Sequence, residues 1–214
     1  YYAATEGGGT IVNAEDWSKF PGTVGKPWPG AEIKILTDEG SEAEPGSQGT
    51  VYMQLSEATK FEYKDDKKKT KKERLIIEDK IYFTVGDIGY VNQEDYLFLC
   101  DRKIDMIISG GANIYPAEIE SVFLMHPKVA DVAVFGIPND EWGEEVKAVI
   151  ELNNNQNPSD QISSELMSFA QENLAKMKLP RSIDFIKKLP RDENGKLYKR
   201  RLRDPYWKNH SSKV

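Results

Sequence analysis

The sequence predicts a mixed α+β protein, in which a small antiparallel, barrel-like β subdomain precedes a compact α+β domain. Short strand-like segments separated by glycine and proline turns fill the first half of the chain, as they do in small antiparallel sheets. Strand and helix signals alternate at short intervals in the second half. A charged segment at 101–105 interrupts the apolar pattern between the halves. We therefore expect a β-rich domain at 1–100, a hinge at 101–105 and a mobile α+β domain at 106–214.

In the first half, 92–95 is a polar turn that joins two strand-like segments into a hairpin. The expected strands are 31–36, 50–55, 80–84, 88–91 and 96–100. The run at 60–74, KFEYKDDKKKTKKER, is rich in lysine and almost without aliphatic residues, so we interpret it as a solvated loop. Binding of this run to an anionic membrane surface is the alternative, which the acids in the same run disfavour.

In the second half, Pro116 marks the start of a helix, because proline is well suited to a first helical turn. This helix is expected to end near His126 and Pro127. A second helix follows from apolar residues at helical spacing in 163–173. The expected strands are 129–135, 145–152 and 182–186.

Composition excludes several classes of protein. The chain has 214 residues and a formal net charge of −6, whereas general nucleic-acid-binding domains are usually basic. No apolar run approaches the roughly 20 residues of a membrane-spanning helix. Cys100 is the single cysteine, so no internal disulfide forms, which agrees with a reducing, cytoplasmic compartment. The two histidines, His126 and His210, lack metal-ligand spacing, and we expect His126 to be a helix-end or surface residue and Cys100 a small buried hydrophobe.

Two motifs carry the most functional information. The run DRKIDMIISGGANIYPAEIE at Asp101–Glu120 places a Gly-Gly loop, Gly110 and Gly111, before a helix start. Far along the chain, Asn194, Gly195 and Lys196 put one lysine on a glycine-containing loop. Glycine permits a close approach of backbone to a ligand, and a loop lysine suits an anion, so a nucleotide is the expected ligand.

The chain resembles the adenylate-forming superfamily of acyl-CoA synthetases, peptide-synthetase adenylation domains and luciferase. The resemblance spans the whole chain, and the segments that carry it occur in the family's order. They are YYAATEGG at Tyr1–Gly8, YFTVGDIGY at Tyr82–Tyr90, DRKIDMIISGGANIYPAEIE at Asp101–Glu120 and LPRDENGKLYKRRLR at Leu189–Arg203. ISGGANIYPAEIE, EWGEEVKAVIEL and the RDPYW tail are most similar to fatty-acid or aryl-acid CoA ligases. The resemblance also implies that the chain is the C-terminal part of a longer protein, downstream of the family's phosphate loop.

The resemblance implies a reaction in two steps. ATP and a carboxylic acid give acyl-AMP and pyrophosphate, and coenzyme A then displaces AMP. It places Tyr2 on the adenine, Thr5 on the α-phosphate and Glu6 on Mg²⁺, which prefers oxygen ligands. It places Asp87 and Arg102 on the ribose.

The resemblance makes Lys196 the strongest catalytic candidate, because the family lysine contacts the oxygens on which charge builds during adenylation. Ser109, Gly110 and Gly111 resemble the loop that lines the channel for the pantetheine arm of CoA. The family presents these two elements in turn, so a hinge is required.

The expected hinge residues are Asp101, Lys103, Ile104 and Asp105. The family commonly has Asp or Lys where this chain has Ile104, a stiff β-branched residue that we expect to prefer burial. Lys103 or Asp105 is then the residue that takes the solvent-exposed position.

Three alternatives stay open beside a CoA ligase. The first is a module that loads a carrier-protein thiol. The second is a non-catalytic interaction fragment, and the third is an enzyme with an oxidative, luciferase-like reaction. The residues do not decide the acid, for which a medium- to long-chain fatty acid is the first expectation and an aryl or branched acid the second. Homodimer formation and contact with a membrane surface are also left open. We expect residues 1–214 alone to be inactive.

Overall fold

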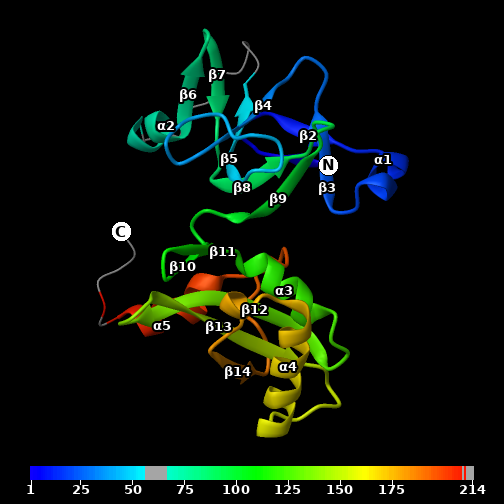
Figure 1. Ribbon diagram of the computed structural model, residues 1–214, viewed down its shortest axis with the longest axis vertical. Coiled ribbons are helices and arrows are strands. Elements are labelled where there is room, and N and C mark those ends of the chain that lie inside the picture. Colours follow the sequence, from blue (N-terminus) through cyan, green and yellow to red (C-terminus); the bar gives the residue numbers. More distant parts are fainter. Residues whose placement is uncertain (56–66, 209, 211–214) are drawn as a thin grey trace. The chain divides into compact units, whose positions relative to one another are not determined.

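The computed structural model describes residues 1–55, 67–208 and 210, which form two compact units (Figure 1). Unit 1 is Tyr1–Ile104 and unit 2 is Asp105–Val214. The division falls within the segment that we expect to act as a hinge.

Unit 1 is built on one antiparallel sheet with strand order β1-β2-β3-β9-β8-β5-β7-β6, in which β4 also pairs with β5. Among the described residues this order is an open path, so the barrel-like expectation reduces to a mostly antiparallel sheet without closure. Its strands are β1 (Tyr2–Ala3), β2 (Gly9–Ile11), β3 (Thr23–Pro27), β4 (Ile33–Leu36), β5 (Gly49–Gln54), β6 (Arg74–Ile77), β7 (Lys80–Phe83), β8 (Asp87–Val91) and β9 (Leu97–Arg102). Its helices are α1 (Ala14–Lys19) and α2 (Lys67–Glu73).

The expected hairpin at 92–95 is present between β8 and β9. The Asn92 side chain accepts hydrogen bonds from the backbone N–H groups of Glu94 and Tyr96, at 3.1 and 2.9 Å. This is the usual way in which asparagine organises a turn. A bulge between Ile88 and Gly89 shifts the register.

The lysine-rich run differs from the expected loop. Lys67–Glu73 is helix α2, and Arg74 begins strand β6, which pairs with β7. Lysine and glutamate are good helix formers, which explains how a run without apolar periodicity is still helical. The rest of the expected loop, residues 60–66, lies outside the described residues.

Unit 2 contains a sheet with strand order β11-β10-β13-β12, in which β14 pairs in parallel with β13. Its strands are β10 (Ile107–Ser109), β11 (Ala112–Ile114), β12 (Val129–Asn139), β13 (Gly143–Leu152) and β14 (Ser182–Ile186). Its helices are α3 (Pro116–Leu124), α4 (Asp160–Asn173), the short 3₁₀ helix η1 (Lys176–Lys178) and α5 (Lys199–Trp207).

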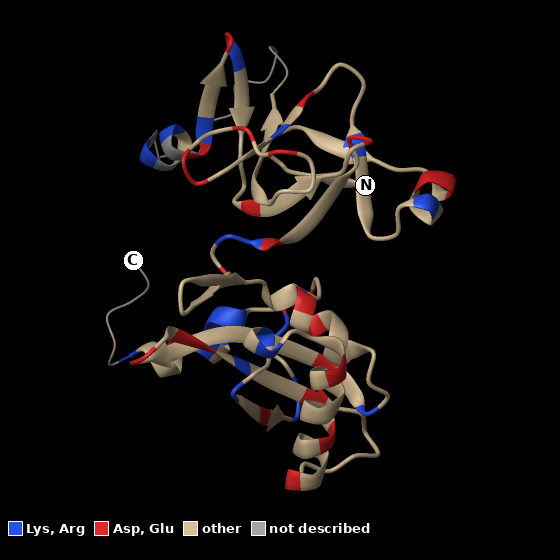
Figure 2. Cartoon of the chain, viewed as in Figure 1, with Lys and Arg blue, Asp and Glu red and all other residues tan. Residues whose placement is uncertain are grey.

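Alternation along β12 gives the sheet of unit 2 two apolar faces. Val132 and Val134 pack with buried residues of α3 and α4, while Ala133 and Phe135 pack on the other face, toward Leu202 of α5. Helices α3 and α4 therefore cover one face and α5 covers the other. Figure 2 shows acidic residues on α3 and α4, whereas α5 carries four basic residues and one acidic residue.

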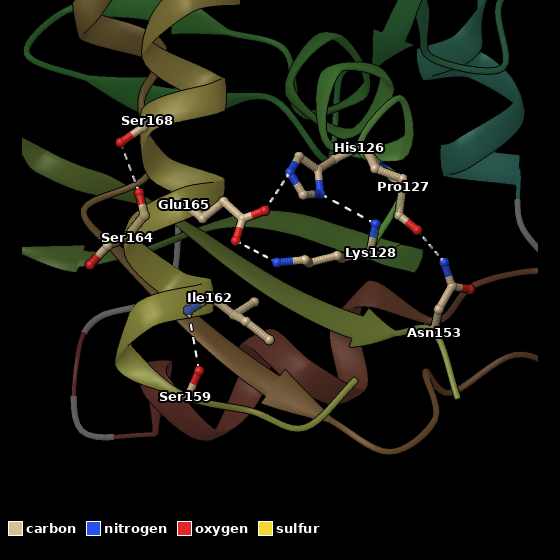
Figure 3. Close-up of polar contacts among 9 residues, drawn as sticks. All are labelled: His126, Pro127, Lys128, Asn153, Ser159, Ile162, Ser164, Glu165 and Ser168. Atoms are coloured by element: carbon tan, nitrogen blue, oxygen red, sulfur yellow. Dashed lines mark hydrogen bonds and ion pairs between the residues drawn. The ribbon is translucent and has the colours of Figure 1, made fainter. Parts of the chain in front are cut away.

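His126 lies at the end of α3, as one of the two expected positions has it, and it is buried, so the surface alternative is wrong (Figure 3). Its Nδ1 accepts a hydrogen bond from the backbone N–H of Lys128, at 3.3 Å, and its Nε2 lies 3.5 Å from Glu165 on α4. Its ring also meets the edge of Phe169. Glu165 pairs with Lys128 as well, so this polar cluster ties the end of α3 to α4. His126 has a structural role in this packing.

Candidate functional site

A cavity of about 370 Å³ in unit 1 collects residues that are up to 100 positions apart in the sequence. The residues that line it are Tyr2, Ala3, Ala4, Thr5, Glu6, Glu73, Val85, Asp87 and Arg102. We call it the Asp87 cavity. It contains every residue of unit 1 that the sequence predicts for nucleotide and metal binding.

Thr5 and Glu6 enter the Asp87 cavity on the turn between β1 and β2. The backbone N–H of Gly7 donates to the carbonyl oxygen of Ala4, at 3.1 Å, so Thr5 and Glu6 are the central residues of a tight turn. Gly8 follows with a φ of +77°, and a Cβ there would lie 2.7 Å from the Cβ of Met53. Only glycine allows the turn to lie this close to β5.

Asp87 and Arg102 meet because they are opposite each other in the β8–β9 ladder. Arg102 Nε lies 3.4 Å from Asp87 Oδ1, and Asp87 is buried while Arg102 is exposed. The backbone on either side is also joined, since the N–H of Lys103 donates to the carbonyl oxygen of Gly86 at 2.7 Å. A carboxylate held in this way keeps lone pairs for hydroxyl groups of a ligand.

Tyr2 uses its hydroxyl group on Asp87. The hydroxyl donates to Asp87 Oδ2 at 2.5 Å. Burial, followed by this hydrogen bond, raises the pKa of Tyr2 well above its ordinary value, so the hydroxyl stays a donor. The structure therefore shows a polar role for Tyr2, and its stacking on adenine stays a prediction.

Glu73 is a residue of the Asp87 cavity that the sequence analysis missed. It ends α2, and its Oε2 is buried with no hydrogen-bond partner among the described residues. It lies in the lysine-rich run, where a single acid gives no signal. Only the folding of α2 beside β6 and β7 brings this carboxylate to the cavity.

A second cavity, of about 350 Å³, lies in unit 2 beside the Gly-Gly motif. The residues that line it are Ser109, Gly110, Ala112, Trp142, Glu145, Val146, Lys176, Met177, Leu179 and Arg181. We call it the Gly110 cavity. Its basic residues, Lys176 and Arg181, come from the segment between α4 and β14 and were not predicted. No spacing in the sequence connects them to the glycine loop.

Gly110 is required by the packing of Trp142. The N–H of Gly110 donates to the carbonyl oxygen of Trp142 at 2.9 Å, and a Cβ on Gly110 would lie 2.4 Å from Trp142 Cε3. Gly110 and Gly111 both have positive φ, +57° and +80°, which favours glycine. Gly111 has open space around it, so the two glycines are needed for different reasons.

Lys196 lies in unit 2 on a tight loop that a β-bridge between Arg191 and Leu197 closes. We call residues 191–197 the Lys196 loop. The Asp192 carboxylate accepts from the backbone N–H groups of Asn194 and Lys196, at 3.0 and 2.8 Å. Gly195 has a φ of +81°, and Lys196 itself is exposed. The structure places this lysine in a different unit from the Asp87 cavity.

The expected hinge residues lie where the two units join. Asp101 and Arg102 end β9, and Lys103 pairs with Asp38 of unit 1 at 2.6 Å. Ile104 is 69% exposed, so the expectation that it prefers burial is wrong. It lies in a turn, where the backbone course and not the side chain sets its exposure.

Residues 118–196 match the AMP-binding enzyme C-terminal domain family. The chain is 37% identical over 218 residues to the fatty acid–[acyl-carrier-protein] ligase ScoC of Streptomyces coeruleorubidus, covering 100% of this chain and 40% of that protein. It is 37% identical to the long-chain-fatty-acid–CoA ligase FadD13 of Mycobacterium tuberculosis, over 96% of this chain and 39% of the relative. It is also 37% identical to the 2-succinylbenzoate–CoA ligase of Geobacillus kaustophilus, over 85% and 35%.

Solved structures give the same picture. The o-succinylbenzoate CoA synthetase (MenE) from Bacillus subtilis, in complex with the acyl-adenylate intermediate OSB-AMP, superposes with a TM-score of 0.78 at 34% identity. That match covers 89% of this chain and 37% of MenE. ATP-bound MatB from Rhodopseudomonas palustris gives a TM-score of 0.76 at 30% identity, over 88% and 36%. The chain thus spans about two fifths of the length of these relatives.

Within the described ranges, no helix is both long and apolar enough to cross a membrane. The same residues contain no cluster of three or more His, Cys, Asp or Glu side chains that would hold a metal ion by itself.

Proposed function

We propose a function from one premise: this chain belongs to the adenylate-forming superfamily, and its residues 118–196 are an AMP-binding enzyme C-terminal domain. The proposal is that the chain is the C-terminal part of an AMP-forming carboxylate–CoA ligase. The observation that carries it is the Asp87 cavity, where Tyr2, Thr5, Glu6, Asp87 and Arg102 converge. Activity belongs to the longer polypeptide that contains this chain, and residues 1–214 alone are inactive.

In this proposal the Asp87 cavity binds ATP and then AMP. Asp87 accepts the ribose hydroxyl groups while Tyr2 and Arg102 hold its carboxylate in place. Thr5 hydrogen-bonds the α-phosphate. Glu6 supplies the oxygen ligand for Mg²⁺, which usually takes only one or two carboxylates and otherwise binds phosphate oxygens. The donor set fits that ion, since Glu6 and Glu73 both line the cavity.

Lys196 provides fixed positive charge for the first step. A carboxylate oxygen of the acid attacks the α-phosphorus of ATP, the bond to the bridging oxygen breaks, and pyrophosphate leaves. Negative charge builds on the phosphoryl oxygens, and an ammonium group placed there stabilises the transition state more than the ground state. Lys196 and the Gly110 loop both belong to unit 2 and serve different steps, so in this proposal unit 2 moves about the segment 101–105 between the steps.

The second step uses the Gly110 cavity. The CoA sulfur attacks the acyl carbon of acyl-AMP, the bond to the phosphate oxygen breaks, and AMP leaves. Ser109, Gly110 and Gly111 border the passage for the pantetheine arm, where larger side chains would obstruct it. Lys176 and Arg181 in the same cavity offer cationic groups to the phosphates of CoA.

The acid is a medium- to long-chain fatty acid in this proposal, with an aryl acid as the second choice. Both FadD13 and the 2-succinylbenzoate ligases are relatives at similar identity. A carrier-protein thiol is the second candidate acceptor, because ScoC acts on an acyl-carrier protein. ATP and CoA as substrates make the cytoplasm the proposed compartment, and the assembly stays open, including a homodimer.

The test uses the complete product of the reading frame that encodes this chain. It is incubated with ATP, Mg²⁺ and a panel of fatty and aryl acids, with CoA or with a phosphopantetheinylated carrier protein. Chromatography follows AMP and the thioester. We expect AMP release with one class of acid, and Lys196→Ala to slow adenylation by about 10²–10³-fold. The same variant should convert supplied acyl-AMP to thioester at the normal rate.

Different outcomes separate the alternatives. Thioester formation only with the carrier protein would replace CoA as the acceptor. Adenylate formation without transfer to either thiol favours a luciferase-like reaction. No AMP release with any acid leaves the non-catalytic interpretation. Thioester formation by residues 1–214 alone would contradict the expected inactivity.

A further inference from the structure

The Arg191 side chain joins the Lys196 loop to the sheet of unit 2 by hydrogen bonds. Arg191 Nε and Nη2 donate to the two oxygens of Asp131, at 2.6 and 2.8 Å. Its Nη1 donates to the carbonyl oxygen of Gly195 at 2.7 Å. Asp131 lies on β12, a long strand that contributes buried residues to both apolar faces. Arg191 thus connects this strand to the residue that precedes Lys196.

The peptide unit between Gly195 and Lys196 is held at both ends. Its carbonyl oxygen accepts from Arg191, and its N–H donates to Asp192 Oδ1 at 2.8 Å. A peptide unit is planar, so fixing both polar ends fixes its orientation. The next peptide unit is held as well, because the Lys196 carbonyl oxygen accepts from the N–H of Asp192 at 3.0 Å, and the two units together set the direction in which the Lys196 side chain leaves the backbone. Gly195 has a φ of +81° and the conformational freedom of glycine, which makes such a restraint necessary.

The Arg191–Asp131 pair is well built for this purpose. Asp131 is only 19% exposed, whereas Arg191 is 40% exposed. Burial alone would raise the pKa of Asp131, but hydrogen bonds from Arg191 and from the N–H of Val132 outweigh it and lower the pKa. The hydrogen bond to Asp131 in turn raises the pKa of Arg191. Both partners are therefore charged at neutral pH.

The guanidinium group of arginine suits this geometry because it is planar and presents several N–H groups in fixed directions. One edge forms the two-pronged contact with the carboxylate while another nitrogen reaches the carbonyl oxygen. A lysine ammonium has the charge but lacks the fork. Replacement of Arg191 by lysine therefore tests whether the loop needs the arginine fork or only a positive charge.

We propose that Arg191 is a positioning residue for the adenylation step, which orients the Gly195–Lys196 peptide unit by bridging it to Asp131. The inference rests on the role proposed above for Lys196. Arg191 does not contact the reacting atoms in this proposal, and it acts only through the direction of Lys196. Small displacements of a catalytic group are costly, since about 1 Å of misplacement lowers rates by up to about 10²-fold.

The test compares Arg191→Ala and Arg191→Lys with wild type in the complete enzyme. Adenylation is followed by ATP–pyrophosphate exchange with the acid that gives the highest wild-type turnover, and thioester formation is followed from supplied acyl-AMP. We expect both variants to lose about 10–100-fold in the kcat of adenylation, with little change in the KM for ATP. Thioester formation should keep its rate. Full adenylation by Arg191→Lys would show that charge alone suffices and would overturn the proposal.

Lys128→Ala is the matched control. Lys128 also pairs with a carboxylate of unit 2, that of Glu165. This pair belongs to the polar cluster around His126 and not to the Lys196 loop (Figure 3). Its loss should leave adenylation unchanged, so an equal loss in this variant would indicate a general effect of destabilising unit 2. If Arg191→Ala does not fold, as judged by circular dichroism, Asp131→Asn gives the same test from the other partner.

A double variant separates positioning from other roles. If Arg191 acts through Lys196, Arg191→Ala in a Lys196→Ala background adds no further loss of adenylation. An additive loss overturns the proposal. Failure of the underlying function looks different, because wild type then releases no AMP or Lys196→Ala keeps full activity. A normal Arg191→Ala beside an impaired Lys196→Ala rejects this inference alone.

Discussion

At the residue scale, Gly110 and Gly111 offer a paired test of steric fit. Alanine at either position must adopt positive φ, which costs about 1 kcal/mol or more. Gly110→Ala also drives a Cβ into Trp142, whereas Gly111→Ala meets no heavy atom within 4 Å. We expect Gly110→Ala to lower the free energy of unfolding by about 1–3 kcal/mol more than Gly111→Ala, in urea titrations followed by circular dichroism. Equal stabilities would mean that Trp142 moves aside without cost.

Asp131 gives a pH-dependent prediction at the same scale. Its pKa is lowered in the folded state, so its ionised form adds stability above its unfolded pKa of about 4. That stability is lost as pH falls through the lower folded pKa. Asp131→Asn should therefore be less stable than wild type by about 1 kcal/mol at pH 6–7. The difference should shrink below about pH 4, and urea titrations across this range check it. A difference that stays constant down to pH 3 would exclude ionisation as its cause.

At the scale of elements, α5 is joined to α3 and β12 by a half-buried ion pair. Lys199 Nζ lies 2.8 Å from Glu120 Oε1, and the same oxygen accepts from the backbone N–H of Val134 at 2.7 Å. Lys199→Met keeps the length of the side chain but leaves the Glu120 carboxylate without the ammonium group. We expect a loss of about 2–3 kcal/mol in the free energy of unfolding.

A second variant and a control make this prediction specific. Lys199→Met combined with Glu120→Gln removes both charges, so it should recover part of the lost stability. Lys178→Met breaks a more exposed pair with Glu118 and should cost less than about 1 kcal/mol. Chemical denaturation of the single and double variants gives these values. A similar loss of unfolding free energy in Lys178→Met and Lys199→Met would contradict the prediction that the more buried ion pair contributes more to stability.

Elements with strong local signals were predictable, and the others were not. The strand at 182–186 coincides with β14, and Ser163–Asn173 lies within α4, because period-2 and helical spacing are local properties. Helices α1, α2 and α5 were missed because they are short or highly charged. In addition, α1 and α5 have no buried residue, and α2 lies in the lysine-rich run. Tertiary packing, not periodicity, makes α5 a helix with Pro205 inside it.

At the scale of the whole molecule, two units with separate apolar cores predict two folding units. Unit 1 has a core around Ile35, Val51, Met53 and Leu97, whereas both apolar faces of the second sheet lie within unit 2. We expect residues 105–214 to fold alone and to unfold cooperatively in urea, because no residue of these cores comes from unit 1. Circular dichroism and amide hydrogen exchange measure this. A polypeptide of residues 105–214 without protected amides in β12 and β13 would refute it.

The sequence by itself determined the mixed α+β class and the family, and it predicted the residue types of the candidate site. These follow from short segments, such as TEGG, VGD and NGK, whose order and composition are readable without a structure. It also predicted a hinge at 101–105, because a run of charged residues has no apolar face to bury.

Only the tertiary structure decided how those residues contact one another. The β8–β9 register, with its bulge, sets Asp87 opposite Arg102, and the strand order brings the Tyr2 hydroxyl to the same carboxylate. Glu73 in the Asp87 cavity and Asp131 beneath Arg191 have no local signal at all. The physical reason is that register, strand order and helix docking are set by burial summed over distant segments. Spacing along the chain reports only on neighbours within a few turns or strands.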